Sequence, residues 1–254
     1  MCSSDLTYTG VTKIVSDFDL IVVRENTEGF YADRNMAAGN GEILVTPDVG
    51  IALRRITRGC CNRIARSAFE LAMQRNKHVT LVHKHNVLKI TDGIFLDACH
   101  EVAKDFPEVK VDEFIVDAMM AHMVRAPERF DVIVTTNMFG DILSDLTAEL
   151  SGSIGMGGSL NAGAHYAMGQ AAHGSAPDIA GQDVANPFSL ILSAAMLLRW
   201  HAQRKNHDLF AKAATHIEVA VAHCVADGQS TRDVGGSLGT KETGKAVIGK
   251  LLLS

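Results

Sequence analysis

The sequence predicts an α/β protein, because short β-branched runs alternate with longer segments of helical spacing, and polar residues follow several of the runs directly. In open α/β sheets, ligands bind beyond the carboxyl ends of the strands, so the polar residues at these ends are the candidate site residues. We expect buried strands at residues 18–23, 78–83, 113–116 and 132–134.

The composition describes a chain that can bury one large core or two smaller ones. It has 254 residues, of which 47% are hydrophobic and 21% charged, and its net charge of -5 gives no electrostatic reason to expect nucleic acid or an anionic membrane as a partner. The five cysteines lack zinc or redox spacing, which is typical of a reducing compartment. We find no apolar run long enough to span a bilayer and no signal-peptide pattern, so we expect a cytoplasmic protein without a membrane partner.

In the first half of the chain we expect an extended segment and two helices besides the buried strands. Residues 1–6 lack the pattern of a domain start, and we expect them to be an artefact of the gene sequence. Residues 42–46 are expected to be extended, and Pro47 and Asp48 are expected to introduce a long helix from about Val49 to Arg75. We interpret the arginines of this segment as a solvated face: Arg54, Arg55, Arg58, Arg63 and Arg66. A further helix is expected at residues 91–106.

Glycines gather between residues 151 and 164, and we place a domain boundary there, between residues 1–151 and 152–254. In the second part, residues 173–181 form a loop of small side chains that lets backbone approach a flat ligand closely. Asn186 and Pro187 match the start of a helix. The remaining expected elements are helices at 188–201, 209–226 and 240–253 and a turn at 231–236.

Three carboxylates lie at strand-to-helix junctions. Asp141 and Asp145 are four residues apart in a helical pattern, so both point to one side, and Asp117 follows the run at 113–116. A single pair with this spacing is more often a solvated helix N-terminus. Three such acids make a shared cation site the better explanation, and their oxygen ligands suit Mg²⁺ or Mn²⁺.

Candidate substrate-binding and proton-transfer residues follow two of the runs. Arg24, at a strand end, offers a bidentate guanidinium for a carboxylate. Tyr31 carries a hydroxyl that donates or accepts a proton, and Lys84 is a candidate acid or base. Taken locally, a surface salt bridge and a half-buried aromatic ring are the better explanations of Arg24 and Tyr31.

Side by side, these stretches resemble the isocitrate/3-isopropylmalate dehydrogenase family of β-decarboxylating 2-hydroxy-acid dehydrogenases. The resemblance implies an isopropylmalate dehydrogenase-like two-domain fold. Residues 1–151 would be the smaller domain, with the substrate, metal and dimer-forming segments, and 152–254 the C-terminal part of the larger, cofactor-binding domain. The family's first strands, two substrate arginines and specificity loop have no counterpart, so we expect the N-terminal part of the larger domain to be missing, which leaves an active and an inactive fragment as the two alternatives. The resemblance rests on residues 24–31 (RENTEGFY), 84–88 (KHNVL), 116–118 (VDA), 137–145 (NMFGDILSD) and 173–181 (HGSAPDIAG) with Asn186, in the family's order.

The resemblance also implies residue roles. Arg24 would bind a substrate carboxylate, and Tyr31 and Lys84 would transfer protons. Asp117, Asp141 and Asp145 would hold one divalent ion that also chelates the substrate. The family works as a homodimer with shared active sites, to which Lys84 and Asp117 come from the neighbouring subunit. The cofactor-binding residues would be Asn86, near the nicotinamide, and His173, Gly174, Ser175, Ala176, Pro177, Asp178, Ile179 and Asn186 around the adenosine half.

The expected reaction is NAD-dependent oxidative decarboxylation of a 3-substituted malate, of the 3-isopropylmalate, isocitrate, homoisocitrate or tartrate type, with Mg²⁺ or Mn²⁺. NAD is predicted because Asp178 would accept hydrogen bonds from a ribose diol and repel a 2′-phosphate. NADP-using relatives resemble one another in having Lys-Tyr at the positions of Asp178 and Ile179. The alternatives are a non-catalytic regulatory or structural subunit, an inactive fragment of the same family and, less favoured, a metal-dependent hydrolase that uses the aspartates alone.

Overall fold

The computed structural model describes residues 1–11, 15–30, 36, 39 and 41–252, and it confirms the α/β class. The chain forms two compact units. One unit is Leu20–Ser144, and the other combines Met1–Asp19 with Asp145–Ser254. The boundary between the units falls within helix α4 (Asn137–Leu150), and the first residues group with the C-terminal part. The division into functional domains at residue 151 stays a prediction.

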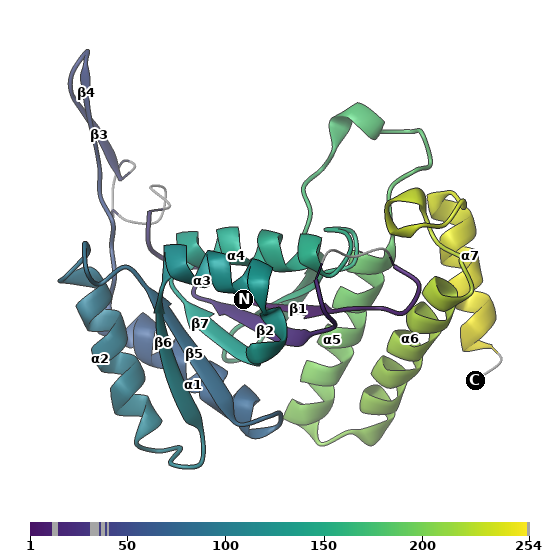
Figure 1. Ribbon diagram of the computed structural model, residues 1–254, viewed down its shortest axis with the longest axis horizontal. Helices are drawn as coiled ribbons and strands as arrows, with labels where there is room; N and C mark the ends of the chain where they lie inside the picture. Colours follow the sequence, from purple (N-terminus) through teal and green to yellow (C-terminus); the bar gives the residue numbers. More distant parts are fainter. Residues whose placement is uncertain (12–14, 31–35, 37–38, 40, 253–254) are drawn as a thin grey trace. The chain divides into compact units, whose positions relative to one another are not determined.

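The unit Leu20–Ser144 is built on four parallel strands in the order β6, β5, β7, β2 (Figure 1). Each strand overlaps a run in which a strand was expected, and β7 is buried along its whole length. Parallel strands run in one direction, so their carboxyl ends lie at one edge of the sheet. The strands are β2 (Asp19–Arg24), β5 (His78–His83), β6 (Lys110–Ile115) and β7 (Val132–Thr135).

Three helices of this unit contact the sheet. Helices α1 (Arg58–Met73) and α2 (Thr91–Ala103) pack against each other, and both contact β5. Helix α3 (Val116–Arg125) begins directly where β6 ends and packs on β5 and β6. Helix α1 buries one apolar face, which includes Ile64, Ala68 and Phe69. A helix with a single apolar face gains most of its stability from this packing.

The expected helix at residues 49–75 is wrong in its first part. Strands β3 (Glu42–Thr46) and β4 (Val49–Ala52) pair antiparallel as a hairpin, and α1 begins only at Arg58, after the N-cap Thr57. Pro47 and Asp48 form the turn, and β-branched residues on both sides favour strands. Figure 1 shows the hairpin standing apart from the sheet of its unit.

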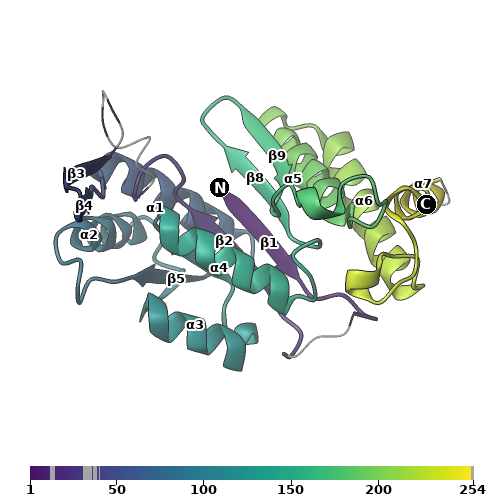
Figure 2. The same cartoon turned by 90° about the horizontal axis from the view of Figure 1, so that it is seen from above.

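The second unit has an antiparallel sheet in the order β1, β8, β9. Figure 2 shows α5 beside β8 and β9, with α6 and then α7 beyond it. Strand β1 comprises most of the residues expected to be an artefact, and that origin stays a prediction. The elements are β1 (Cys2–Leu6), β8 (Gly158–Ala162), β9 (Ala167–Ala171), α5 (Phe188–Lys205), α6 (Asp208–Ala226) and α7 (Thr240–Leu251).

Helix α5 lies unusually close to β9. A Cβ at Gly169 would lie 2.7 Å from the carbonyl oxygen of Ser193, so only glycine fits there. The Ser193 hydroxyl donates to the carbonyl of Gln170 (2.7 Å) and accepts from the amide of Ser159 (2.9 Å). These buried hydrogen bonds fix α5 to both strands.

The expectation that no segment is apolar enough to span a membrane is wrong by length and composition. Among the described residues, helix α6 meets both criteria, with a mean hydropathy of 1.2. One such helix is weak evidence, because core helices pass the same test. Its residues Val221, Cys224 and Val225 are buried in a core cluster with Phe188 of α5 and Val247 of α7.

Two glycines test this packing. We predict that Gly244→Ala, inside α7, stabilises the chain by about 0.5–1 kcal/mol, because a Cβ there meets nothing within 4 Å and alanine favours the helix. Gly236→Ala should destabilise by roughly 1–3 kcal/mol, because its Cβ would lie 1.9 Å from the carbonyl oxygen of Ser230. Urea unfolding of both variants measures the difference, and equal stabilities would contradict the structure.

Candidate functional site at the carboxyl edge of the sheet

The parallel register brings several candidate residues to one edge of the sheet. Thr135 of β7 lies opposite Arg24 of β2 on one side and opposite Val82 of β5 on the other. Asn137 and Lys84 each lie two residues further along their chains, and they therefore occupy the same edge. The edge is where an open α/β sheet binds ligands.

Arg24 is held against the first turn of α4. Its side chain is only 11% exposed, its Nε donates to Asn137 Oδ1 (2.9 Å), and its Nη1 forms an ion pair with Asp141. A Cβ at Gly140 would lie 2.6 Å from Cγ of Arg24, so the missing side chain at residue 140 makes room for the arginine. The structure thus brings together two of the predicted site residues, Arg24 and Asp141.

Asn137 is a buried residue of this edge that the sequence analysis named only as part of a motif. It is 1% exposed, and besides accepting from Arg24 it donates its Nδ2 to the carbonyl of Glu28 (2.8 Å). Its position directly after a strand was the available signal. The amide links the strand end at Arg24 to the segment that follows it.

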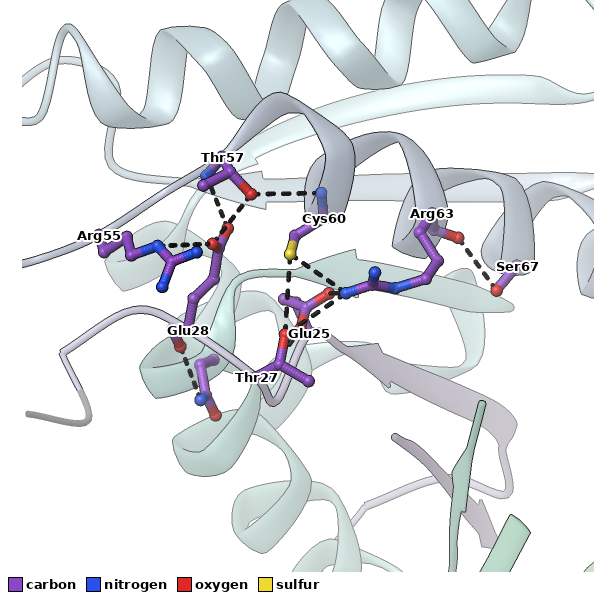
Figure 3. Close-up of polar contacts among 9 residues, drawn as sticks. Glu25, Thr27, Glu28, Arg55, Thr57, Cys60, Arg63 and Ser67 are labelled. Atoms are coloured by element: carbon purple, nitrogen blue, oxygen red, sulfur yellow. Dashed lines mark hydrogen bonds and ion pairs between the residues drawn. The ribbon is translucent and has the colours of Figure 1, made fainter. Parts of the chain in front are cut away.

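That segment is tied to the start of α1 (Figure 3). The buried Glu28 carboxylate accepts from the Thr57 amide (2.7 Å) and hydroxyl (3.0 Å), where its charge favours the helix N-terminus. Glu25 accepts from the Thr27 amide (2.8 Å) and meets Arg63 Nη2 at 3.3 Å. These contacts fix the backbone beside Arg24.

Lys84 and Asp117 form a second pair of predicted residues. Lys84 Nζ lies 2.5 Å from Asp117 Oδ1, with side-chain exposures of 26% and 69%. The hydrogen bond from Lys84 holds the pKa of Asp117 below its ordinary value, so this carboxyl is ionised near neutrality. The two residues come from the ends of the neighbouring strands β5 and β6.

The three aspartates do not meet within one chain. Among the residues that the structure describes, no three His, Cys, Asp or Glu side chains group as a metal site. Asp141 pairs with Arg24, Asp145 lies one turn further along α4, and Asp117 pairs with Lys84. Tyr31 lies outside the described residues. Within a single chain the site therefore contains two separate ion pairs, Arg24 with Asp141 and Lys84 with Asp117.

The predicted cofactor residues lie on exposed segments. Asn86 is exposed in the turn after Lys84. In the other unit, Gly174, Ser175, Ala176, Pro177 and Asp178 are exposed, and the short helix Pro177–Ile179 follows Ala176, whose φ is 40°. His173 Nδ1 lies 2.8 Å from the carbonyl of Gly174.

Asn186 has a local structural role. Its Oδ1 accepts from the amide of Phe188, the first residue of α5 (2.9 Å), and its Nδ2 donates to Asp233 (2.9 Å). Asp233 also accepts from Ser153 (2.6 Å) and Thr231 (2.6 Å). Sequence reasoning did not identify Asp233, because it lies in a turn without a chemical motif.

The interpretation of the arginine run as a solvated face is wrong for Arg54. Its side chain is 6% exposed and pairs with the fully buried Asp92. Residue 54 precedes α1, so it does not lie on the face of that helix. Neither residue was expected at the site.

The parallel sheet, with polar residues at the carboxyl ends of its strands, is typical of α/β proteins that bind a ligand at this edge. The isocitrate/isopropylmalate dehydrogenase family model matches residues 3–247. The 3-isopropylmalate dehydrogenase of Archaeoglobus fulgidus is 44% identical over 243 residues, covering 95% of this chain and 70% of that enzyme. The chain belongs to the isocitrate/isopropylmalate dehydrogenase family, which confirms the family and fold expected from the sequence.

Two further comparisons agree. The isocitrate dehydrogenase (NADP) of Rickettsia bellii is 41% identical over 242 residues, covering 92% of this chain and 47% of that enzyme. The crystal structure of isocitrate dehydrogenase from Methylococcus capsulatus superposes with a TM-score of 0.88 at 40% identity, covering 98% of this chain and 72% of that one. The chain therefore spans between about half and three quarters of these relatives' lengths.

His83, one residue before Lys84, provides a pH test of the edge. Burial lowers its pKa, against the carboxylates of Glu113 and Asp92, which raise it, and with His85 and His100, which lower it. Below about pH 6.5 the His83 imidazole binds a proton more readily in the unfolded chain than in the folded chain. The free energy of unfolding therefore falls as the pH drops below this value.

We predict that His83→Asn reduces the loss of stability at acidic pH. The amide oxygen of asparagine replaces Nδ1, which accepts from the His85 amide at 3.0 Å. Urea unfolding near pH 7.5 and near pH 5.5 measures the change for both proteins. A stability difference between them that is the same at both pH values would contradict the assignment.

Proposed function

We propose that the protein takes part in NAD-dependent oxidative decarboxylation of a 3-substituted malate, with a divalent ion, as part of a homodimer. The observation that carries the proposal is the contact between Arg24 and Asp141. A guanidinium for a carboxylate and an acid for a cation lie side by side there. A 2-hydroxy acid that chelates a cation needs both groups: the acid holds the cation, and the guanidinium binds a carboxylate of the substrate. Residues 1–151 would bind the substrate and the ion, and residues 152–254 the adenosine half of the cofactor.

The proposed chemistry uses few groups of the chain. A base of the chain takes the proton of the C2 hydroxyl, and a bound nicotinamide would accept the hydride from C2, which gives a ketone β to a carboxylate. Loss of CO₂ leaves an enolate, and an acid protonates its carbon. Lys84 and Tyr31 are the proposed proton-transfer pair, and Arg24 holds the substrate carboxylate. The bound divalent ion would supply Lewis acidity at the oxygen of C2.

The acidic residues fit a hard cation. Asp141 and Asp145 lie on successive turns of α4, and the Asp141 side chain is 48% exposed. Asp117 is ionised and exposed. Carboxylate oxygens of this kind suit Mg²⁺ or Mn²⁺. Because one chain does not gather all three, we propose that Asp117, with Lys84, completes the site of a second copy.

An exposed hairpin supports association between copies. Strands β3 and β4 carry apolar side chains to solvent, and Leu44 is 75% exposed. Exposed apolar strands favour burial against a partner. The net charge of -5 gives no reason to propose nucleic acid as a partner, and we propose a cytoplasmic location.

NAD is the proposed cofactor, although one of the relatives is named for NADP. Asp178 is exposed in the loop that would meet the adenosine ribose. A carboxylate accepts hydrogen bonds from a ribose diol and repels a 2′-phosphate. The residues His173–Ile179 and Asn186 would surround the adenosine half, and Asn86 would approach the nicotinamide.

Calorimetric titration tests this proposal. We predict that the chain binds NAD at least about 10-fold more tightly than NADP, and that replacing Asp178 with Lys and Ile179 with Tyr reverses the order. Asp208→Lys, on α6, controls for the added charge. Mn²⁺ should bind the wild-type protein and bind Asp141→Asn weakly. Absence of any nucleotide binding would favour a non-catalytic subunit, and a preference for NADP would contradict the cofactor assignment.

A mixing experiment tests the shared site. Lys84→Met and Asp141→Asn should each be inactive, because each damages both sites of a homodimer. Random exchange of the two variants makes half of the dimers hybrid, and each hybrid keeps one intact site, so about a quarter of the activity should return. Each variant exchanged with itself is the control. No recovery from hybrids that form would contradict the sharing.

A further inference from the structure

Arg54 and Asp92 form a buried ion pair beside the edge. Arg54 Nη1 lies 2.6 Å from Asp92 Oδ1, with side-chain exposures of 6% and 0%. Burying two charges is costly, and the pair alone is weak evidence for added stability. Where such a pair persists, it restrains the geometry of whatever it contacts.

What Asp92 contacts is the backbone of Lys84. The other carboxylate oxygen, Oδ2, accepts the Lys84 amide hydrogen at 2.5 Å. Asp92 lies in the first turn of α2, so one carboxylate joins the start of that helix to the end of β5. The position of the Lys84 backbone sets how far its ammonium group reaches.

Arg54 extends the same restraint to α4. Its Nη2 donates to Thr136 Oγ1 (3.1 Å), one residue before α4 begins, and its Nη1 donates to Thr91 Oγ1 (2.5 Å). The guanidinium carbon lies 5.6 Å from the ring centroids of both Phe30 and Phe139. A planar cation over two aromatic rings is held in orientation as well as in position.

We infer that Arg54 and Asp92 are positioning residues that fix Lys84 relative to the start of α4. The inference rests on the proposed function, in which Lys84 transfers a proton. Neither residue touches the reacting groups. They act through the backbone of Lys84 and through Thr136, and their loss moves the ammonium group away from its working position.

The chain contains a matched control pair. Arg75 Nε lies 2.6 Å from Asp131 Oδ1, and Asp131 Oδ2 accepts the backbone amide of Asn76 at 3.0 Å. This pair has the same chemistry and is also largely buried, but it lies at the opposite, amino-terminal ends of β5 and β7. Asp131→Asn therefore loses a buried charge without disturbing the carboxyl edge.

The experiment compares Asp92→Asn, Arg54→Lys and Asp131→Asn in the full chain. We expect Asp92→Asn to lower kcat about 10- to 100-fold with little change in the KM for NAD, because a small misplacement of a reacting group costs that much. Arg54→Lys, which keeps the charge, should lower kcat less. Asp131→Asn should lose comparable stability to urea and keep kcat. Equal kcat losses in Asp92→Asn and Asp131→Asn would overturn the inference.

A second readout does not depend on activity. The rate at which an amine-acylating reagent modifies Lys84, followed by mass spectrometry against pH, reports the surroundings of its ammonium group. Asp92→Asn and Arg54→Lys should shift this profile, whereas the profile of Lys110, paired with Asp112 at 2.9 Å, should not move. An unchanged Lys84 profile in both variants would overturn the inference. An inactive wild-type protein with a shifted Lys84 profile would instead count against the proposed function alone.

Discussion

The register between β2, β7 and β5 is the constraint on which the rest of the edge depends. Arg24 lies opposite Thr135, which also lies opposite Val82, so the residues that follow these positions emerge together. A slip of one residue would turn every side chain of a strand to the other face. Arg24 would then lose Asn137 and Asp141, whereas Thr135 would lose the hydrogen bond that its hydroxyl donates to the carbonyl of Val82 (2.7 Å).

Charge is distributed unevenly within the pairs at this edge. In the Arg24–Asp141 and Lys84–Asp117 pairs the basic group is the more buried partner and the acid the more exposed one. The Arg24 guanidinium is buried, so losing Asp141 without another anion in its place is costly, whereas the more exposed Lys84–Asp117 pair contributes only about 0–1 kcal/mol. The basic groups stay anchored, and the acids remain open to a ligand. This arrangement supports the proposal that the edge binds an acidic substrate together with a cation.

The sequence was a good guide where one local signal determines structure. The β-branched runs predicted four strands, and the strand ends predicted from them place Arg24, Lys84 and Asp117 at or just beyond the carboxyl ends of β2, β5 and β6. It was a poor guide at residues 47–57, where Pro47 and Asp48 start a hairpin turn instead of a helix. Arg54 was misread for a related reason, because its burial follows from Asp92, a partner distant in sequence, and a helical charge pattern carries no such information.

Gly140 explains why the motif around α4 is more informative than its two aspartates. Glycine inside a helix costs about 1 kcal/mol relative to alanine, so its presence in the first turn calls for a structural reason. The reason is the aliphatic part of Arg24, whose Cβ, Cγ and Cδ all lie within 3.1 Å of where a Cβ of residue 140 would be. Two acids one turn apart occur on many solvated helices. A glycine directly before the first acid, with an arginine at the end of the adjoining strand, specifies that this helix start must approach a guanidinium, and the contact between Arg24 and Asp141 follows from that approach.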